Sequence, residues 1–134
     1  MEQKYLIDTS VVIKYLDEVY SGNALSFIDN LVDNDSRVSF ITKIELLVWN
    51  PPNPEDIKIR VEFLAGSAIH YINDDIIERA TQIRKETKIK IPDAIIAATA
   101  IVYDFILLSD NDKDFTKLDY LGLKYMNPNT AFPK

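Results

Sequence analysis

The stretch Tyr5-Leu6-Ile7-Asp8-Thr9-Ser10 decides the fold, because three apolar residues run directly into an acid and two hydroxyl residues. Residues 11–16 follow at once with a further apolar pattern. This order predicts a buried strand that ends at Ile7, a sharp turn at Asp8 and a helix that begins near Ser10. Asp8 is therefore expected at the carboxyl end of a central strand, which is the edge where ligands bind in open α/β sheets.

Strands and helices alternate along the rest of the chain. Further strands are predicted at residues 37–41, 68–72, 105–108 and 123–126, and helices at 23–32, 42–49, 54–65, 74–87 and 93–102. The last of these helices is apolar nearly all round, so it is expected to be buried, and a loose tail is expected from Asn127. The alternation predicts one α/β domain over residues 1–134, with a mostly parallel sheet of about five strands covered by helices on both faces.

The composition narrows the functional classes. Hydrophobic residues make up 47% and charged residues 27% of the 134 residues, as in ordinary soluble proteins. The absence of cysteine excludes thiolate metal sites, and the single histidine, His70, leaves little room for histidine-based zinc or Ser-His-Asp chemistry. No apolar run reaches the ~18 residues that span a bilayer and no signal-peptide pattern is present, so we expect a cytoplasmic protein without membrane contact. The net charge of −6 counts against a simple nucleic-acid binder but not against a nuclease whose acids bind a divalent metal.

Four acidic groups are expected at one edge of the predicted sheet. Asp8 leaves the first strand there, and Glu45 lies in the first turn of the helix after the second strand. Asp93 opens the helix that leads into the strand at 105–108, and the acidic segment 110–114 leaves that strand. Because each connecting helix runs roughly antiparallel to its strands, all four groups are expected at the carboxyl edge.

Each acid also has a purely structural interpretation. Asp8 can cap the helix that follows it, and Glu45 can complete a capping box with Thr42. Asp93 follows Pro92 in a first helical turn, where negative charge is favourable, and segment 110–114 can be a solvated loop. These separate roles do not explain why the acids share one edge.

Carboxylates gathered at one edge repel one another unless they are protonated or bridged by cations. Hard divalent ions such as Mg²⁺ and Mn²⁺ prefer oxygen ligands, and Mg²⁺ is typically held by a few carboxylates together with waters and substrate phosphates. Such a site activates a water, orients a phosphodiester and stabilises the charge that develops in the transition state. The acids therefore indicate metal-dependent phosphodiester hydrolysis.

Three segments of the chain resemble the PIN-domain nucleases, and within them the VapC-type toxins of bacterial toxin–antitoxin pairs. Residues 6–16, LIDTSVVIKYL, are similar to the family's opening strand, acid and helix, and residues 39–47, SFITKIELL, resemble its second motif. Residues 91–115, IPDAIIAATAIVYDFILLSDNDKDF, resemble its third and fourth motifs together, with Asp114-Phe115 as the usual ending. The resemblance covers almost the whole chain.

The resemblance implies a three-layer α/β/α PIN-like fold and an endoribonuclease that hydrolyses RNA with a metal-activated water, using Mg²⁺ or Mn²⁺. It also implies a homodimer and a cognate antitoxin whose C-terminal segment lies over the active site. The catalytic and metal-binding residues that it implies are Asp8, Glu45, Asp93 and Asn111, with Asp112 as a further metal ligand. Whether Asp110, Asn111 or Asp112 completes the site is left open by the sequence.

Other interpretations fit the residues less well. A non-catalytic PIN-like module that only binds a partner would not need the four acids. A Ca²⁺ loop that began at Asp110 would require glycine and glutamate where Phe115 and Leu121 stand. Trp49 and Phe63, with the apolar helix faces between residues 23 and 65, could form a dimer or antitoxin surface, although core packing is the commoner role of such residues. The single histidine is interpreted as structural.

Overall fold

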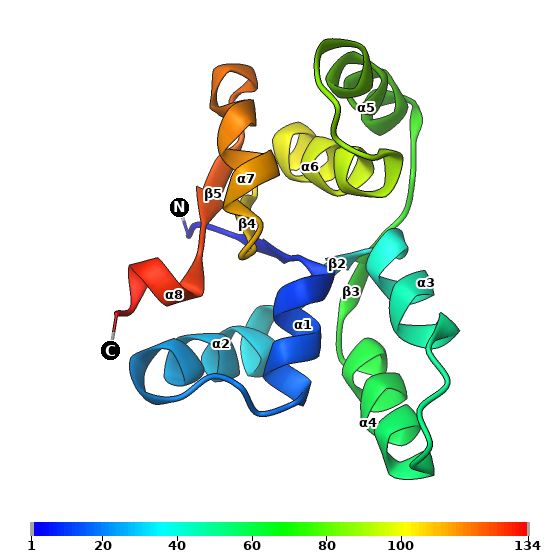
Figure 1. Ribbon diagram of the computed structural model, residues 1–134, viewed down its shortest axis with the longest axis vertical. Helices are drawn as coiled ribbons and strands as arrows, with labels where there is room; N and C mark the ends of the chain where they lie inside the picture. The colour runs from blue at the N-terminus through cyan, green and yellow to red at the C-terminus, as the bar shows by residue number, and fades with distance from the viewer. Residues whose placement is uncertain (1, 134) are drawn as a thin grey trace.

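Five short parallel strands form the centre of the structure, a computed structural model that describes residues 2–133 (Figure 1). The strands are β1 (Tyr5–Ile7), β2 (Arg37–Ser39), β3 (Ala68–His70), β4 (Ile106–Leu108) and β5 (Lys124–Met126). Hydrogen bonds join β1, β4 and β5 in that order with β4 in the middle, and join β2 to β3 separately. Because β1 also contacts β2, the two ladders lie side by side. The predicted parallel arrangement of about five strands is confirmed, with its hydrogen bonding interrupted between β1 and β2.

Helices connect the strands and close the chain. They are α1 (Thr9–Leu16), α2 (Gly22–Asp35), α3 (Phe40–Val48), α4 (Pro54–Ala65), α5 (Asp74–Glu86), α6 (Ile91–Tyr103), α7 (Asp112–Phe115) and α8 (Pro128–Ala131), with a 3₁₀ helix η1 (Thr116–Leu121) after α7. Within residues 2–133 no helix has the length and apolar character to cross a membrane.

Neighbouring residues of the strands pack into different cores. Leu6 and Leu107 lie in a core built with α5 and α6. Ile7 and Leu108 lie in a second core with residues of α1, α2 and α4. Side chains of a strand alternate between the two faces of a sheet, so each of these strands is buried on both faces. The helices accordingly cover the strands from two sides (Figure 1), as the three-layer α/β/α expectation requires.

Helix α6 is buried as predicted. Ala94, Ala97, Ala98 and Ala100 are fully buried, and the helix packs against α5 and β4. The methyl side chains allow this close packing without forcing neighbouring backbones apart. The helix begins two residues earlier than expected, after Lys90, and Pro92 stands in its first turn, where a missing N–H costs no hydrogen bond. Asp93 thus lies within the first turn.

Four local predictions were wrong. The strand expected at 37–41 ends at Ser39, because the Ser39 hydroxyl accepts a hydrogen bond from the Ile41 N–H over 3.1 Å and caps α3. The capping box of Thr42 and Glu45 therefore does not exist, since both residues lie inside the helix. The loop expected at 110–114 contains the start of α7, and the tail expected to be loose forms α8 behind an Asn127 cap.

Candidate active site

Asp8 is held rigidly where β1 ends. Its backbone N–H continues the ladder to the Leu108 carbonyl at 2.9 Å, and its Oδ1 caps α1 by accepting from the Thr9 N–H at 2.9 Å. Its Oδ2 accepts from the Ser109 hydroxyl at 2.7 Å and from the Ser10 hydroxyl at 3.2 Å. Only 5% of the residue is exposed. The capping interpretation of Asp8 is therefore correct, and it fixes the carboxylate at the carboxyl edge of the strands.

Glu45 reaches the same edge from α3. Its Oε1 accepts from the Thr9 hydroxyl at 2.7 Å, and the Thr9 and Thr42 hydroxyl oxygens lie 2.8 Å apart. Because Thr9 has one hydroxyl hydrogen and gives it to Glu45, Thr42 donates to Thr9. Thr42 is fully buried and Thr9 nearly so. The glutamate is thus positioned by a neighbour of Asp8 and not by a helix cap.

Asp93 is half-buried and faces other acids. Burial raises the pKa of Asp93, and the carboxylates of Asp114 and Glu45 raise it further, while the Lys90 ammonium lowers it. Burial likewise raises the pKa of Asp8 to about 6; the Ser109 hydrogen bond opposes this rise and the Asp93 carboxylate adds to it. These mutual effects place Asp8, Glu45, Asp93 and Asp114 in one electrostatic cluster, named here the acid cluster.

Asn111 lies beside this cluster and positions Asp114. The Asn111 Nδ2 donates to Asp114 Oδ2 at 3.1 Å, and the Asn111 Oδ1 accepts from the Asp114 N–H at 3.4 Å. The Asn111 N–H in turn donates to the Ser109 hydroxyl at 3.1 Å, and that hydroxyl donates to Asp8. A chain of hydrogen bonds therefore links Asp8 to Asp114 through Ser109 and Asn111. Asp114 was not among the residues implied as ligands, although it closes the fourth motif of the resemblance.

Asp112 and Asp110 have other partners. Asp112 Oδ1 accepts from the Tyr125 hydroxyl and from Asn127 Nδ2, and these hydrogen bonds lower the pKa of the exposed Asp112 carboxyl. Asp110 forms an ion pair with Lys14 of α1. Asp112 therefore serves to join α7 to β5, and Asp114 is the acid of this segment that faces Asp93.

The donor chemistry of the acid cluster fits a hard divalent cation. All four side chains offer carboxylate oxygens, and the raised pKa values of Asp8 and Asp93 reflect burial and repulsion that a bound cation would offset. Within residues 2–133, no three histidine, aspartate or glutamate side chains are placed to hold a metal ion together. A divalent ion at the acid cluster would need water ligands beside the carboxylates, as Mg²⁺ usually keeps in proteins.

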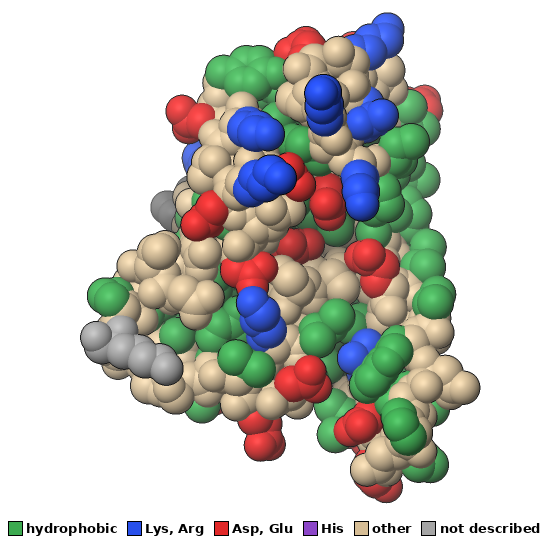
Figure 2. All heavy atoms as spheres, in the orientation of Figure 1, with side chains coloured by type: hydrophobic (Ala, Val, Ile, Leu, Met, Phe, Trp, Pro, Cys, Tyr) green, Lys and Arg blue, Asp and Glu red, His purple; other side chains and the backbone are tan. Residues whose placement is uncertain are grey.

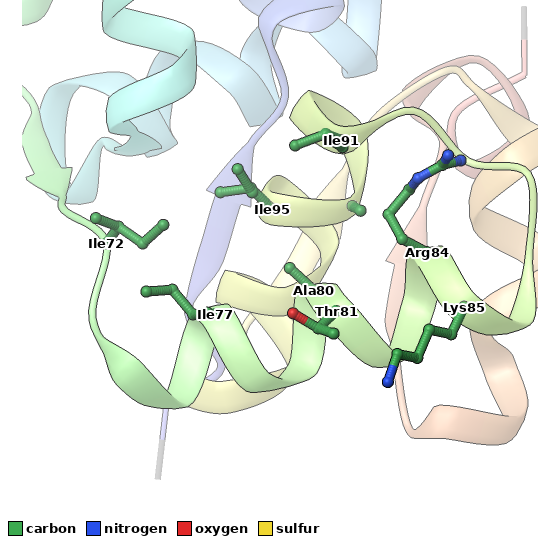
Figure 3. A pocket seen from close by; sticks show the side chains of 9 residues that line it. Ile72, Ile77, Ala80, Thr81, Arg84, Lys85, Ile91 and Ile95 are labelled. Carbon is green, nitrogen blue, oxygen red and sulfur yellow. The ribbon is translucent and has the colours of Figure 1, made fainter.

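An apolar cavity of about 380 Å³ lies elsewhere, between α5 and α6. Figure 3 shows isoleucines from the segment before α5, from α5 and from α6 around a common space. Its lining residues are Ile72, Ile77, Ala80, Thr81, Arg84, Lys85, Ile91, Ala94 and Ile95. Since no acidic side chain lines it, this cavity is separate from the acid cluster.

Three further residues singled out from the sequence, Phe63, Trp49 and His70, make packing contacts away from the acid cluster. Phe63 is buried in the second core, as ordinary packing would have it. Trp49 is 45% exposed and stacks under the Arg60 guanidinium, 3.9 Å from the ring centroid. His70 packs against the rings of Tyr103 and Phe105, which also stack on each other, and burial lowers the pKa of His70. None of these three belongs to the acid cluster.

Comparisons with known proteins agree with this fold. The model of the PIN domain family matches residues 5–121. Ribonuclease VapC1 of Methanocaldococcus jannaschii is 30% identical over 132 residues, covering 92% of this chain and 87% of the relative. A toxin–antitoxin complex from Klebsiella pneumoniae contains a chain with 27% identity and a TM-score of 0.74, covering 93% of this chain and 98% of that one. A chain of DNA-bound VapBC from Salmonella typhimurium shares the fold with a TM-score of 0.80 at 17% identity, over 95% of this chain and 99% of that one. The chain belongs to the PIN domain family, in which its similarity is to the VapC-type members.

Proposed function

We propose that this chain is a metal-dependent endoribonuclease and the toxin of a toxin–antitoxin pair. The observation that carries the proposal is the meeting of Asp8, Glu45, Asp93 and Asp114, which come from the end of β1, from α3, from α6 and from α7. The similarity to a ribonuclease over nearly the whole chain supports RNA as the substrate. The reaction is hydrolysis: a water oxygen bonds to phosphorus, the bond from phosphorus to the leaving oxygen breaks, and the leaving oxygen takes up a proton.

Asp8 and Asp93 are the proposed principal metal ligands, and Asp114 completes the set with Asn111 holding it in place. Bound Mg²⁺ or Mn²⁺ would supply Lewis-acid activation of water and charge neutralisation at the phosphate. Asp8 is pre-positioned for this role because Ser109, Ser10 and the Thr9 N–H fix its two oxygens before any ligand binds. The Asp8 side chain therefore needs little further ordering when the substrate binds.

Glu45 is proposed as a further metal ligand that also orients the attacking water. The Thr9 hydroxyl fixes Glu45 Oε1 at 2.7 Å, which leaves Oε2 to accept a hydrogen bond from water. Glu45 is also more exposed than Asp8, so water reaches it easily. A carboxylate held by one oxygen and solvated at the other can take the proton of a water as its oxygen approaches phosphorus.

The proposed partners follow from the same similarity. One similar chain, at 27% identity, was solved within a toxin–antitoxin complex, which supports an antitoxin partner for this chain. Exposed apolar side chains of α3, namely Ile44, Leu47 and Val48, continue into Trp49 and offer a surface for such a partner. A homodimer is proposed from the family resemblance, and light scattering on the purified protein tests it.

Cleavage of a mixed RNA pool by the purified protein tests the proposed function. Mg²⁺ or Mn²⁺ is expected to support cutting, EDTA to stop it, and Asp93→Asn to abolish it. Asp75→Asn is the matched control. Asp75 is an exposed acid in the first turn of α5, so it resembles Asp93 in its position at the start of a helix but does not belong to the acid cluster. Equal cutting by Asp93→Asn and Asp75→Asn would refute the site. Absence of both cutting and Mn²⁺ binding would favour the alternative, a PIN-like module that only binds a partner.

A further inference from the structure

Five lysines lie in the two segments of the chain that contain or adjoin Asp93 and Asp114. Lys85 stands in the last turn of α5, Lys88 and Lys90 lie in the segment between α5 and α6, and Lys113 and Lys117 lie on α7 and η1. All five are exposed. Figure 2 shows Lys and Arg side chains gathered over the part of the molecule that holds α5, α6 and α7, next to acidic side chains at the middle of the same face. We call these five residues the lysine rim.

The two segments of the lysine rim are joined in space. The Tyr120 hydroxyl of η1 donates to Glu86 Oε1 at the end of α5 over 2.7 Å. Lys90 stands at the N-cap position of the helix whose first turn carries Asp93, and Lys113 directly precedes Asp114. The rim therefore reaches the acid cluster from two neighbouring elements, not from one helix end.

The rim lysines form no ion pairs in the described structure, although the chain as a whole has a net charge of −6. Of the acids near the rim, Glu86 accepts from Tyr120, and Asp112 accepts from Tyr125 and Asn127. Asp93 lies close enough for the Lys90 ammonium to lower its pKa.

Helix-end stabilisation explains only part of this pattern. Cations are favourable in the last turn of a helix, which accounts for Lys85 and Lys113. The same effect disfavours Lys90 at the start of α6, where negative charge is preferred. A row of free lysines that leads to an acidic metal-binding cluster suits a polyanion whose next phosphate lies at that cluster.

We propose that the lysine rim binds the phosphate backbone of the RNA on one side of the scissile bond. The inference rests on the proposed function and adds to it the direction in which the substrate leaves the acid cluster, across α6 toward α7 and the end of α5. The rim holds the strand through phosphates, so it contributes affinity without choosing the sequence.

Binding of a fluorescein-labelled RNA of random sequence, followed by anisotropy in EDTA over a series of salt concentrations, tests the rim. The variant Lys90→Gln/Lys113→Gln removes two rim charges, and Lys4→Gln/Lys58→Gln removes two exposed charges elsewhere. We expect the rim variant to bind about tenfold more weakly than the control, with a salt slope smaller by about 1.4, as for two lost phosphate contacts on a single strand. Equal melting temperatures establish that both variants are folded.

Equal affinity and equal salt slope in the two variants would overturn the inference. The inference would also be overturned if the rim variant lost binding to poly-L-glutamate but bound RNA as well as the control does, because the rim would then be a site for an acidic peptide. Cleavage assays separate this failure from failure of the proposed function. If the parent cuts RNA with Mn²⁺ and the rim variant binds and cuts like the control, only the rim is refuted. If the parent cuts no RNA but the rim variant still loses RNA affinity, the nuclease proposal fails and the rim stands.

Discussion

The Thr9 hydroxyl donates to Glu45 Oε1 over 2.7 Å and so ties the residue after Asp8 to the acid of α3. The Thr42 hydroxyl in turn donates to the Thr9 hydroxyl, and the two oxygens lie 2.8 Å apart. The two elements that supply Asp8 and Glu45 therefore share a buried hydroxyl pair, and the relative position of the two carboxylates depends on it.

Thr9→Val is expected to lower RNA cleavage by about 10- to 100-fold, as loss of a group that orients a metal-site side chain commonly does. Valine keeps the shape of threonine but cannot fix Glu45. The fall is expected in kcat more than in KM, because the substrate's phosphates do not contact Thr9 in this account. Steady-state kinetics with Thr81→Val as the control checks this, since Thr81 is an exposed residue of α5. If Thr9→Val had the same kcat as the parent, the positioning of Glu45 by Thr9 would not contribute to the reaction.

Asp114 and Asp112 are expected to behave differently although they are two residues apart. Asp114→Asn is expected to reduce cleavage by at least about tenfold, since it removes a carboxylate that faces Asp93. Asp112→Asn keeps an acceptor for Tyr125 and Asn127 and is expected to cut RNA within about twofold of the parent. Cleavage rates at saturating Mn²⁺ check the pair, and the opposite order of the two variants would return Asp112 to the site.

The stability of the metal-free protein is expected to depend on Asp8. Its pKa is about 6 in the folded protein against 3.8 in the unfolded chain, so the folded state binds more protons between these values. Unfolding free energy therefore falls as pH rises from about 4 to about 6, and the penalty is complete above that range. At 1.36 kcal/mol per unit of pKa the penalty is on the order of 3 kcal/mol at neutral pH.

Asp8→Asn is accordingly expected to raise the melting temperature in EDTA at pH 7.5 and to lose this advantage near pH 4. Asparagine keeps one oxygen for the Ser109 hydroxyl but carries no charge to bury. Thermal unfolding over that pH range checks the prediction. A variant less stable than the parent at every pH would show that the hydrogen bonds of Asp8 outweigh the cost of burying its charge.

Local patterns were sufficient to predict the layers of the fold. Leu6-Ile7 and Leu107-Leu108 are short apolar runs without polar alternation, as expected of strands buried on both faces, and the alanines of α6 match its buried position. The meeting of Asp8, Glu45 and Asp93 at one edge was predictable because chain direction in parallel strand–helix units fixes which ends lie together.

Where several similar side chains could make the same contact, local sequence patterns did not predict which one does. Ser39 and Thr42 are both possible caps for α3, and only the end of β2 decides in favour of Ser39. In the segment Asp110 to Asp114 four of the five residues are aspartate or asparagine, and contacts with residues distant in sequence decide which of them faces the site. Asp110 forms an ion pair with Lys14. Asp112 accepts hydrogen bonds from Tyr125 and Asn127. Asp114 is therefore the acid of this segment that faces Asp93.

Calorimetric titration with Mn²⁺ tests most directly the claim that Asp8, Glu45, Asp93 and Asp114 form one metal site. The parent is expected to bind Mn²⁺. Each of Asp8→Asn, Asp93→Asn, Asp114→Asn and Glu45→Gln is expected to weaken binding about 10- to 100-fold. Asp75→Asn and Asp112→Asn are expected to bind like the parent. Mn²⁺ binding that is unaffected by all four substitutions, or lost equally with the two controls, would contradict the account.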